Sequence, residues 1–264
     1  MSNKYLRTSD LARAVGIHAN TVRLYVDWGL LPPVERSASG YRLFTQRHLD
    51  CLRLARAIYA APYPGRGFRA LGNEMIQRAV ADDWLGALEK AHTHLGAVKA
   101  ELERAEAAAD LLEHWAQTGS AEADGVLLPL GEVSSLLGVS HDVVRNWERD
   151  GLIRVRRNPV NNYRLFGARE IERLRIIRLL ARAGYSHMAI LRMFIELDAG
   201  NTRDLRTILD TPRADEDIFT AADHWLTTLQ SQEALAKHII EMISGVIGAR
   251  EAQETPCPTE PLSG

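Results

Sequence analysis

The sequence predicts a mainly α-helical protein built from two copies of one small module, each followed by a long helix. Three observations predict this architecture. The motif Tyr-Arg-Leu-Phe occurs twice, at 41–44 and at 163–166. The residues around both occurrences match at one constant offset. An apolar repeat with the seven-residue period of a coiled coil follows each copy.

The duplication extends over about 58 residues without a gap, at an offset of 122 positions. The matching pairs include Gly16 with Gly138, Val22 with Val144, Arg23 with Arg145, Gly29-Leu30 with Gly151-Leu152, Arg47 with Arg169, Leu52-Arg53 with Leu174-Arg175, and Arg56 with Arg178. Because self-similarity at a fixed offset indicates a repeated structural unit, the chain contains the same module twice.

Within each copy, two short helical patterns lie about a turn apart, which predicts a helix-turn-helix. Gly16 is expected to follow the first helix as its C′ residue, and Ser140 to cap a second helix. Two apolar stretches joined by turn residues, Ser39-Gly40 or Asn161-Asn162, then predict a small hairpin, the wing. The second helix of such a unit can enter the major groove of DNA, and a wing arginine can reach phosphates.

The charge distribution favours contact with a polyanion at the two copies. The formal charge is −2 overall, yet residues 1–61 and 128–183 each carry +5. Residues 62–127 carry −5 and residues 184–264 carry −7. Basic segments on an otherwise acidic chain are what local binding to nucleic acid requires.

Two segments resemble DNA-binding domains of the MerR family of bacterial transcription regulators. They are GIHANTVRLYVDWGLLPPVERSASGYRLFTQRHLDCLRLARAI and GVSHDVVRNWERDGLIRVRRNPVNNYRLFGAREIERLRIIRLL. The shared signature is a glycine with valine or isoleucine, a recognition helix with an arginine and an aromatic residue, Gly-Leu, and Tyr-Arg-Leu-Phe before a helix rich in leucine and arginine. The resemblance covers about 120 residues in two pieces.

The resemblance implies that the recognition helices and the wings contact DNA. The recognition-helix arginines would clamp the backbone, the wing arginines would meet phosphates, and Asn20 and Asp142 would face bases. The expected DNA-binding residues are Asn20, Thr21, Arg23, Tyr25, Tyr41, Arg42, His141, Asp142, Arg145, Trp147, Tyr163 and Arg164. For Tyr25 and Trp147, packing against the wing is an equally open interpretation.

The second copy departs from the family pattern at its recognition helix. Asp142 is acidic where a basic residue is common, and Trp147 replaces a tyrosine. An aspartate accepts a hydrogen bond from cytosine N4 but repels phosphate. We therefore expect the two modules to read different half-sites, with the second contributing less affinity.

Each copy is followed by an apolar seam with alternating spacings of four and three residues. The first seam comprises Trp84, Leu88, Ala91, Leu95, Val98, Leu102, Ala105, Ala109, Leu112 and Ala116. The second comprises Ile218, Ala222, Trp225, Leu229, Ala236, Ile239, Ile243 and Val246, interrupted by Gln232. We expect the two helices to pair within the chain as a pseudo-dimer; a homodimer with four modules is the alternative.

These patterns divide the chain into consecutive parts. The expected parts are a first winged helix-turn-helix domain at 1–75, a first long helix at 82–118, a linker at 119–127, a second winged helix-turn-helix domain at 128–200, a second long helix at 214–250, and a disordered tail at 251–264. Residues 184–199 are expected to form a short helix after the second module. The stretch around 65–67 is expected to be a loop, because Pro62 and Pro64 break the preceding helix.

No cofactor or metal site is expected. Cys51 and Cys257 are the two cysteines, too few for a disulfide framework and not placed as a thiolate pair. His92 and His94 are two positions apart, so they do not share a helix face, and we expect both on the surface.

Several aromatic residues have a structural interpretation beside a functional one. Trp84, Trp115 and Trp225 near the helix ends would line a small effector pocket or, in the more common case, pack as core. Trp28, Phe44 and Phe166 are expected in the module cores.

Three function classes remain in competition. The favoured one is a cytoplasmic, sequence-specific regulator that binds double-stranded promoter DNA and distorts it, with RNA polymerase and a small-molecule effector as further candidate partners. The alternative is an architectural or phage-type DNA-binding protein without effector control. An enzyme is not expected, because no catalytic triad, paired carboxylate or phosphate loop is recognisable, and no apolar run is long enough to span a membrane.

Overall fold

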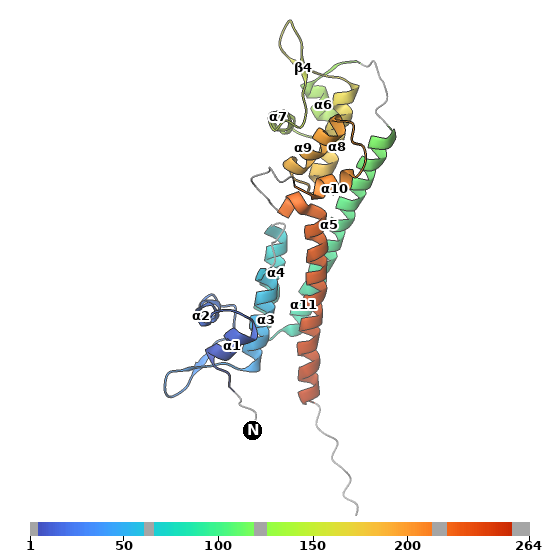
Figure 1. Ribbon diagram of the computed structural model, residues 1–264. Helices are drawn as coiled ribbons and strands as arrows, with labels where there is room; N and C mark the ends of the chain where they lie inside the picture. Colours follow the sequence, from blue (N-terminus) through green and yellow to red (C-terminus); the bar gives the residue numbers. More distant parts are fainter. Residues whose placement is uncertain (1–4, 61–65, 119–125, 213–220, 255–264) are drawn as a thin grey trace, which may run out of the picture. The chain divides into compact units, whose positions relative to one another are not determined.

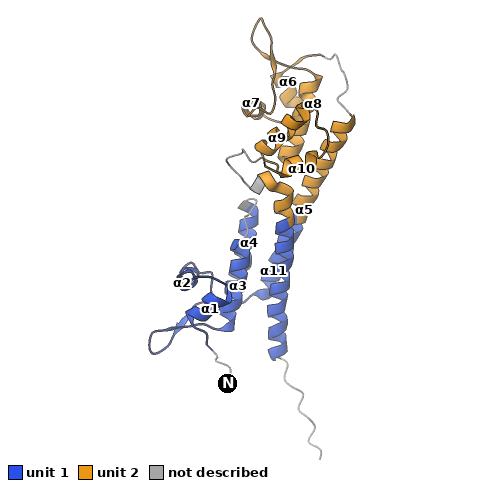
Figure 2. Ribbon diagram, in the orientation of Figure 1, with its two compact units in different colours: residues 1–98, 231–264 blue, residues 99–230 orange. Residues whose placement is uncertain are grey.

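The computed structural model describes residues 5–60, 66–118, 126–212 and 221–254, and it is mainly α-helical, as the sequence predicts (Figure 1). The chain divides into two compact units (Figure 2). One comprises residues 1–98 and 231–264, and the other comprises residues 99–230. Each unit therefore contains one module together with parts of both long helices, instead of a continuous stretch of chain.

The first unit contains the first module and the helix that follows it. Its elements are α1 (Thr8–Ala14), α2 (Ala19–Asp27), β1 (Glu35–Arg36), β2 (Arg42–Leu43), α3 (Gln46–Ala60) and α4 (Arg66–Val80). α1 ends where Gly16 adopts a φ of +65°, a left-handed conformation that favours glycine. β1 and β2 pair antiparallel as the expected hairpin, and Leu6 bridges Phe44 beside it.

Segments of both long helices complete the core of this unit. Trp84, Ala87 and Ala91 of α5 (Trp84–Thr118) are buried together with Ile239 and Ile243 of α11 (Trp225–Glu254). The Arg250 guanidinium near the carboxyl end of α11 pairs with Asp82 at 2.8 Å and lies 5.3 Å from the Trp84 ring centroid. The two segments therefore run antiparallel here.

The second unit repeats the module and extends it. Its elements are β3 (Leu128–Pro129), α6 (Leu130–Leu137), α7 (His141–Arg149), β4 (Arg156–Arg157), β5 (Arg164–Phe166), α8 (Ala168–Arg182), α9 (His187–Asp198), α10 (Leu205–Asp210) and the 3-10 helix η1 (Ala221–His224). The strands form a three-stranded sheet in the order β3-β5-β4. The pairing of Leu128 with Phe166 repeats the bridge of the first module at the same offset of 122.

The core of the second unit also draws on both long helices. Ala105, Ala108 and Leu112 of α5 are buried with Trp225 and Leu229 of α11. The Trp225 indole donates to the carbonyl of Ala183 at 2.7 Å, next to Gly184 with a φ of +98°. A Cβ at this glycine would lie 2.6 Å from the indole ring, so both the backbone and the packing require glycine here.

The structure corrects two expected boundaries. Residues 66–80 form α4, so the expectation of a loop around 65–67 is wrong where the structure describes it. The second long helix begins at Trp225 and continues to Glu254, instead of covering 214–250, so the expected tail begins inside a helix. Ile218, most of the expected linker and residues 255–264 lie outside the described residues.

Two expectations about burial were wrong and one is confirmed. Trp28 is 63% exposed instead of lying in the core, and His94 is 1% exposed instead of lying on the surface. His94 is buried because α4 packs beside α5, and its ring meets Phe68 edge-on with 5.6 Å between centroids. Phe44 and Phe166 are fully buried, as expected.

Candidate nucleic-acid interface

The amino end of the first recognition helix, α2, presents polar side chains to solvent. The imidazole of His18 caps the helix by accepting a hydrogen bond from the Asn20 amide at 3.2 Å. Asn20 and Arg23 are exposed and Thr21 is half-buried. Nη1 of Arg23 donates to Oδ1 of Asn20 at 3.0 Å, which leaves the arginine its full positive charge.

The first wing is a tight hairpin with an exposed tip. The amide of Ser37 donates to the carbonyl of Tyr41 at 2.8 Å, and Gly40 adopts a φ of +84° between them. Tyr41 is 75% exposed and Arg42 is half-buried. Among the described residues, Arg42 makes no ion pair, so its guanidinium is available to an anion.

The second recognition helix, α7, has the same shape with different charges. Ser140 caps it by accepting from the Val143 amide at 3.3 Å, as expected from the sequence. His141, Asp142 and Arg145 are exposed. Nη1 of Arg145 forms an ion pair with Oδ1 of Asp142 at 3.2 Å, where the first module has a neutral amide.

A carboxylate also holds the second wing. Oε2 of Glu148, on α7, lies 2.6 Å from Nε of Arg164, and Oε1 of the same residue lies 3.2 Å from Nη2 of Arg157. The position in the first module that corresponds to Glu148 is Val26. The wing arginine of the second module is thus partly neutralised within its own module, whereas Arg42 is not.

The two hairpins differ in register although their sequences align without a gap. Arg36 pairs with Arg42 in the first, leaving five residues between the strands, whereas Arg157 pairs with Arg164 in the second, leaving six. Asn158 and Asn161 accept hydrogen bonds from the amides of Val160 and Tyr163, at 2.8 and 3.1 Å, and shape the longer loop. Tyr163 at its end is 70% exposed.

Comparisons with known proteins match the sequences of both modules. The family model described as MerR HTH family regulatory protein matches residues 6–60 and again residues 128–195. The chain carries two MerR-type helix-turn-helix domains in tandem. Over these residues it is similar to transcription regulators of this family.

The relatives match over a short segment. The HTH-type transcriptional regulator CueR of Escherichia coli O6:H1 is 41% identical over 51 residues, which is 19% of this chain and 38% of the relative. CueR of Salmonella typhi is 41% identical over 51 residues, 19% and 37% of the two chains, and CueR of Vibrio cholerae serotype O1 is 43% identical over 49 residues, 19% and 35%. The chain thus spans less than two-fifths of the length of these relatives. No solved structure gives a significant match.

In both MerR-type modules, the aromatic residue of the recognition helix is buried. Tyr25 is 6% exposed and Trp147 is 4% exposed, and both belong to the hydrophobic cores of their units. Side chains so deeply packed expose little surface to DNA, which favours the packing interpretation that the sequence left open for both residues. They support the helix that carries the exposed residues.

The three tryptophans for which the sequence left an effector pocket as the alternative to core packing lie in the core or pack against it. Trp84 belongs to the core of the first unit, and its indole donates to Asp82 at 3.2 Å. Trp225 belongs to the core of the second unit, and Trp115 packs against that core half-buried. Their positions thus match the structural interpretation that the sequence left open.

The sequence alone did not single out Glu148, the residue that pairs with both arginines of the second wing. The signal was available, because the ungapped alignment places a carboxylate opposite Val26. Within the described ranges, no group of three or more His, Cys, Asp or Glu side chains is placed to hold a metal ion. No helix in this part of the chain is long and apolar enough to cross a bilayer.

Proposed function

We propose that the protein is a sequence-specific regulator of transcription that binds double-stranded DNA through α2, α7 and the two wings. The observation that carries this proposal is the repeated geometry of a capped recognition helix and a hairpin, each with exposed polar side chains. A helix amino end favours anions through its free backbone amides and its dipole, so both recognition helices suit the approach of a phosphate backbone.

The exposed side chains suit base and phosphate contacts of different kinds. Asn20 offers a carboxamide, which pairs with adenine through two hydrogen bonds, whereas Asp142 offers a carboxylate that accepts from cytosine N4. Arg42 and Arg164 suit phosphates beside each groove. We expect Asn20 and Asp142 to specify bases and the arginines to supply affinity.

The two modules are expected to contribute unequally. Arg23 and Arg42 are free of carboxylates among the described residues, whereas Arg145 and Arg164 are paired with Asp142 and Glu148. The first module therefore presents the stronger positive field. We expect an asymmetric operator whose two halves differ in sequence and in their share of the binding energy.

We also propose that the protein is a monomeric pseudo-dimer, in which one chain supplies both DNA-binding modules. Apolar residues of both α5 and α11 are buried within the chain, in the core of each unit together with residues of the modules. A second copy is then not needed to bury them. Light scattering over a range of concentrations tests this: a mass near 29.4 kDa is expected, and a mass near twice that value would favour the homodimer with four modules.

The resemblance to MerR-type regulators implies bent or untwisted DNA in the complex and a cytoplasmic site of action with RNA polymerase as a partner. Deformation makes binding depend on base steps that no side chain touches. Energy transfer between dyes at the two ends of a bound duplex measures the bend, and an unchanged end-to-end distance would contradict this part of the proposal.

The decisive experiment for DNA recognition begins with the purified chain selecting duplexes from a randomised pool. Its affinities for the selected duplex and for a scrambled duplex are then measured by titration. A regulator is expected to prefer the selected duplex by at least about a thousandfold at physiological salt. A preference below about tenfold would instead support the architectural or phage-type alternative. No binding to either duplex would reject both.

A further inference from the structure

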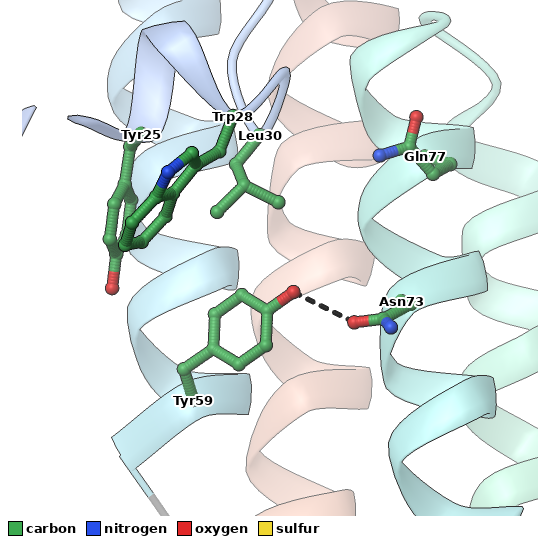
Figure 3. A pocket seen from close by; sticks show the side chains of 6 residues that line it. All are labelled: Tyr25, Trp28, Leu30, Tyr59, Asn73 and Gln77. Carbon is green, nitrogen blue, oxygen red and sulfur yellow. Dashed lines mark hydrogen bonds between the residues drawn. The ribbon is translucent and has the colours of Figure 1, made fainter. Parts of the chain in front are cut away.

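A cavity of about 540 Å³ lies in the first unit, behind the recognition helix. Figure 3 shows side chains from α2 and the residues just after it, from α3 and from α4 around it. Its walls are formed by Tyr25, Trp28, Leu30, Tyr59, Asn73 and Gln77. Small-molecule sites in proteins commonly have volumes in the range of about 300–1,000 Å³.

One wall of this cavity is aromatic and partly open to solvent. The rings of Tyr25 and Trp28 lie 6.1 Å apart between centroids, with 30° between their planes. Trp28 is 63% exposed and Tyr59 is 37% exposed, so neither ring is needed to seal the core. An exposed tryptophan face next to a hollow is a surface on which a flat ring can stack.

The second module shows that the fold does not require this wall. At the offset of 122, Asp150 stands in place of Trp28 and Ala181 in place of Tyr59. Asp150 bonds to His187 at 2.8 Å instead of contributing a ring. Leu30 and its counterpart Leu152 are buried in both modules, and Trp147 keeps a buried ring in place of Tyr25. The shared core thus persists, while the exposed rings of Trp28 and Tyr59 occur in the first module alone.

The opposite wall is polar and uncharged. The Tyr59 hydroxyl donates to Oδ1 of Asn73 at 2.7 Å, which leaves the amide hydrogens of Asn73 to face a ligand. The Gln77 amide nitrogen lies 3.5 Å from the Gly29 carbonyl, which leaves its oxygen as an acceptor. All six lining side chains are uncharged, so the cavity suits a neutral ligand with a donor and an acceptor on one edge.

We propose that this cavity binds an uncharged, planar heteroaromatic molecule of two or three fused rings, which stacks on Trp28 and directs a lactam-like edge to Asn73 and Gln77. Apart from the buried Tyr25, none of its lining residues is among the expected DNA-binding residues, and none of the three tryptophans discussed above lines it. It rests on the geometry of the first unit, and its test needs no DNA.

The probe is 2-quinolinone, which has a flat bicyclic ring and adjacent N–H and C=O groups. Its saturated counterpart, decahydro-2-quinolinone, keeps the lactam edge and lacks the aromatic face. Binding to the full chain is followed by the NMR signals of the five tryptophan indole N–H groups, with that of Trp28 assigned from a Trp28→Phe variant. Saturable shifts of the Trp28 signal are expected with 2-quinolinone, and binding at least tenfold weaker is expected with the saturated lactam.

Two variants and one control complete the test. Trp28→Ala and Tyr59→Ala are each expected to weaken binding of 2-quinolinone by tenfold or more, and circular dichroism checks that both remain folded. Leu136→Ala removes an apolar side chain of the second module that is 52% exposed, and it is expected to change nothing. The proposal is overturned if binding does not saturate below about 1 mM, if Trp28→Ala binds like the parent, or if the saturated lactam binds equally well.

Discussion

Nη1 of Arg145 lies 3.2 Å from Oδ1 of Asp142 on the exposed face of α7. At the matching place on α2, Arg23 donates to the neutral amide of Asn20 at 3.0 Å. As an exposed ion pair, the Asp142–Arg145 contact adds little to stability. Its larger effect is on the local field, because it removes one unit of positive charge from the amino end of a recognition helix. The two recognition helices thus present two different electrostatic potentials to solvent.

Replacing Asp142 with Asn is expected to make the second module resemble the first. The substitution removes a negative charge near the phosphates and exchanges a carboxylate for a carboxamide. We expect tighter binding and a shift in preference at one operator position from cytosine to adenine. Selection with the variant and the parent in parallel measures both effects. An unchanged preference at every position would mean that Asp142 does not face a base.

Replacing Arg42 with Ala is expected to weaken DNA binding more than replacing Arg164 with Ala. Arg42 has no carboxylate partner among the described residues, whereas Arg164 is held by Glu148 at 2.6 Å. Loss of a phosphate contact should reduce binding to all sequences and lower the slope of log affinity against log salt by about 1. Titrations at several salt concentrations give both quantities, and equal effects of the two substitutions would contradict the proposed asymmetry.

Replacing Glu148 with Gln is expected to strengthen DNA binding through the second wing. The change releases Arg157 and Arg164 from their carboxylate partner. We expect a gain of about twofold to fivefold, because a partly exposed ion pair contributes at most about 1 kcal/mol. Val26→Ala, at the matching position of the first module, is the control. Weaker binding by the glutamine variant would show that the ion pair positions the wing instead of neutralising it.

The stability of the first unit is expected to fall as the pH is lowered below about 6.5, the ordinary pKa of histidine. Burial lowers the pKa of His94 and that of His48, so the folded state binds protons less readily than the unfolded state. Stability is therefore fully present above the unfolded pKa and declines as the pH falls toward the folded values. Urea denaturation at pH 7.5, 6.5 and 5.5 measures this decline.

His94→Leu isolates the contribution of one residue to that pH dependence. Nδ1 of His94 has no hydrogen-bond partner among the described residues, so leucine removes a titrating group without breaking a bond at that atom. We expect a smaller loss of stability between pH 7.5 and 5.5 than in the parent. His92→Leu, at an exposed position of the same helix, should leave the dependence as it was.

Replacing Gly184 with Ala is expected to destabilise the second unit by about 2–4 kcal/mol, the combined effect of a left-handed backbone and an overpacked core. The added methyl group would collide with the indole of Trp225. Gly248→Ala on α11 is the matched control, because nothing lies near its Cβ position, and a stabilisation of about 0.5–1 kcal/mol is expected. Thermal denaturation compares the two, and equal effects would contradict the packing at Gly184.

Much of the fold is predictable from the sequence, because duplication, capping residues and apolar spacing are local signals. Gly16, Ser140 and the two Tyr-Arg-Leu-Phe motifs each act within a few residues of chain. The helix at 66–80 was missed because Pro62 and Pro64 precede it, and a proline near a helix start is compatible with the helix that follows.

Other features depend on contacts between distant residues and had no local signal. His94 is buried because Phe68 packs against it from another helix, and Trp28 is exposed because α2 ends with that residue outside the core. The one-residue difference in hairpin register follows from side-chain bonds of Asn158 and Asn161, which an ungapped alignment does not reveal. For the candidate site, the exposed residues were predictable, whereas the pairing of Glu148 with Arg164 required the structure.

The core around Trp84 and Ala91 is incomplete until Ile239 and Ile243 have been synthesised. These two residues are added to the chain about 150 residues later. At typical elongation rates of about 5–20 residues per second, the first module has an uncovered apolar seam for roughly 8–30 seconds. During that interval, the nascent chain exposes the helix surface that α11 later covers. The order of synthesis therefore makes α11 the last helix needed for either unit to complete its core.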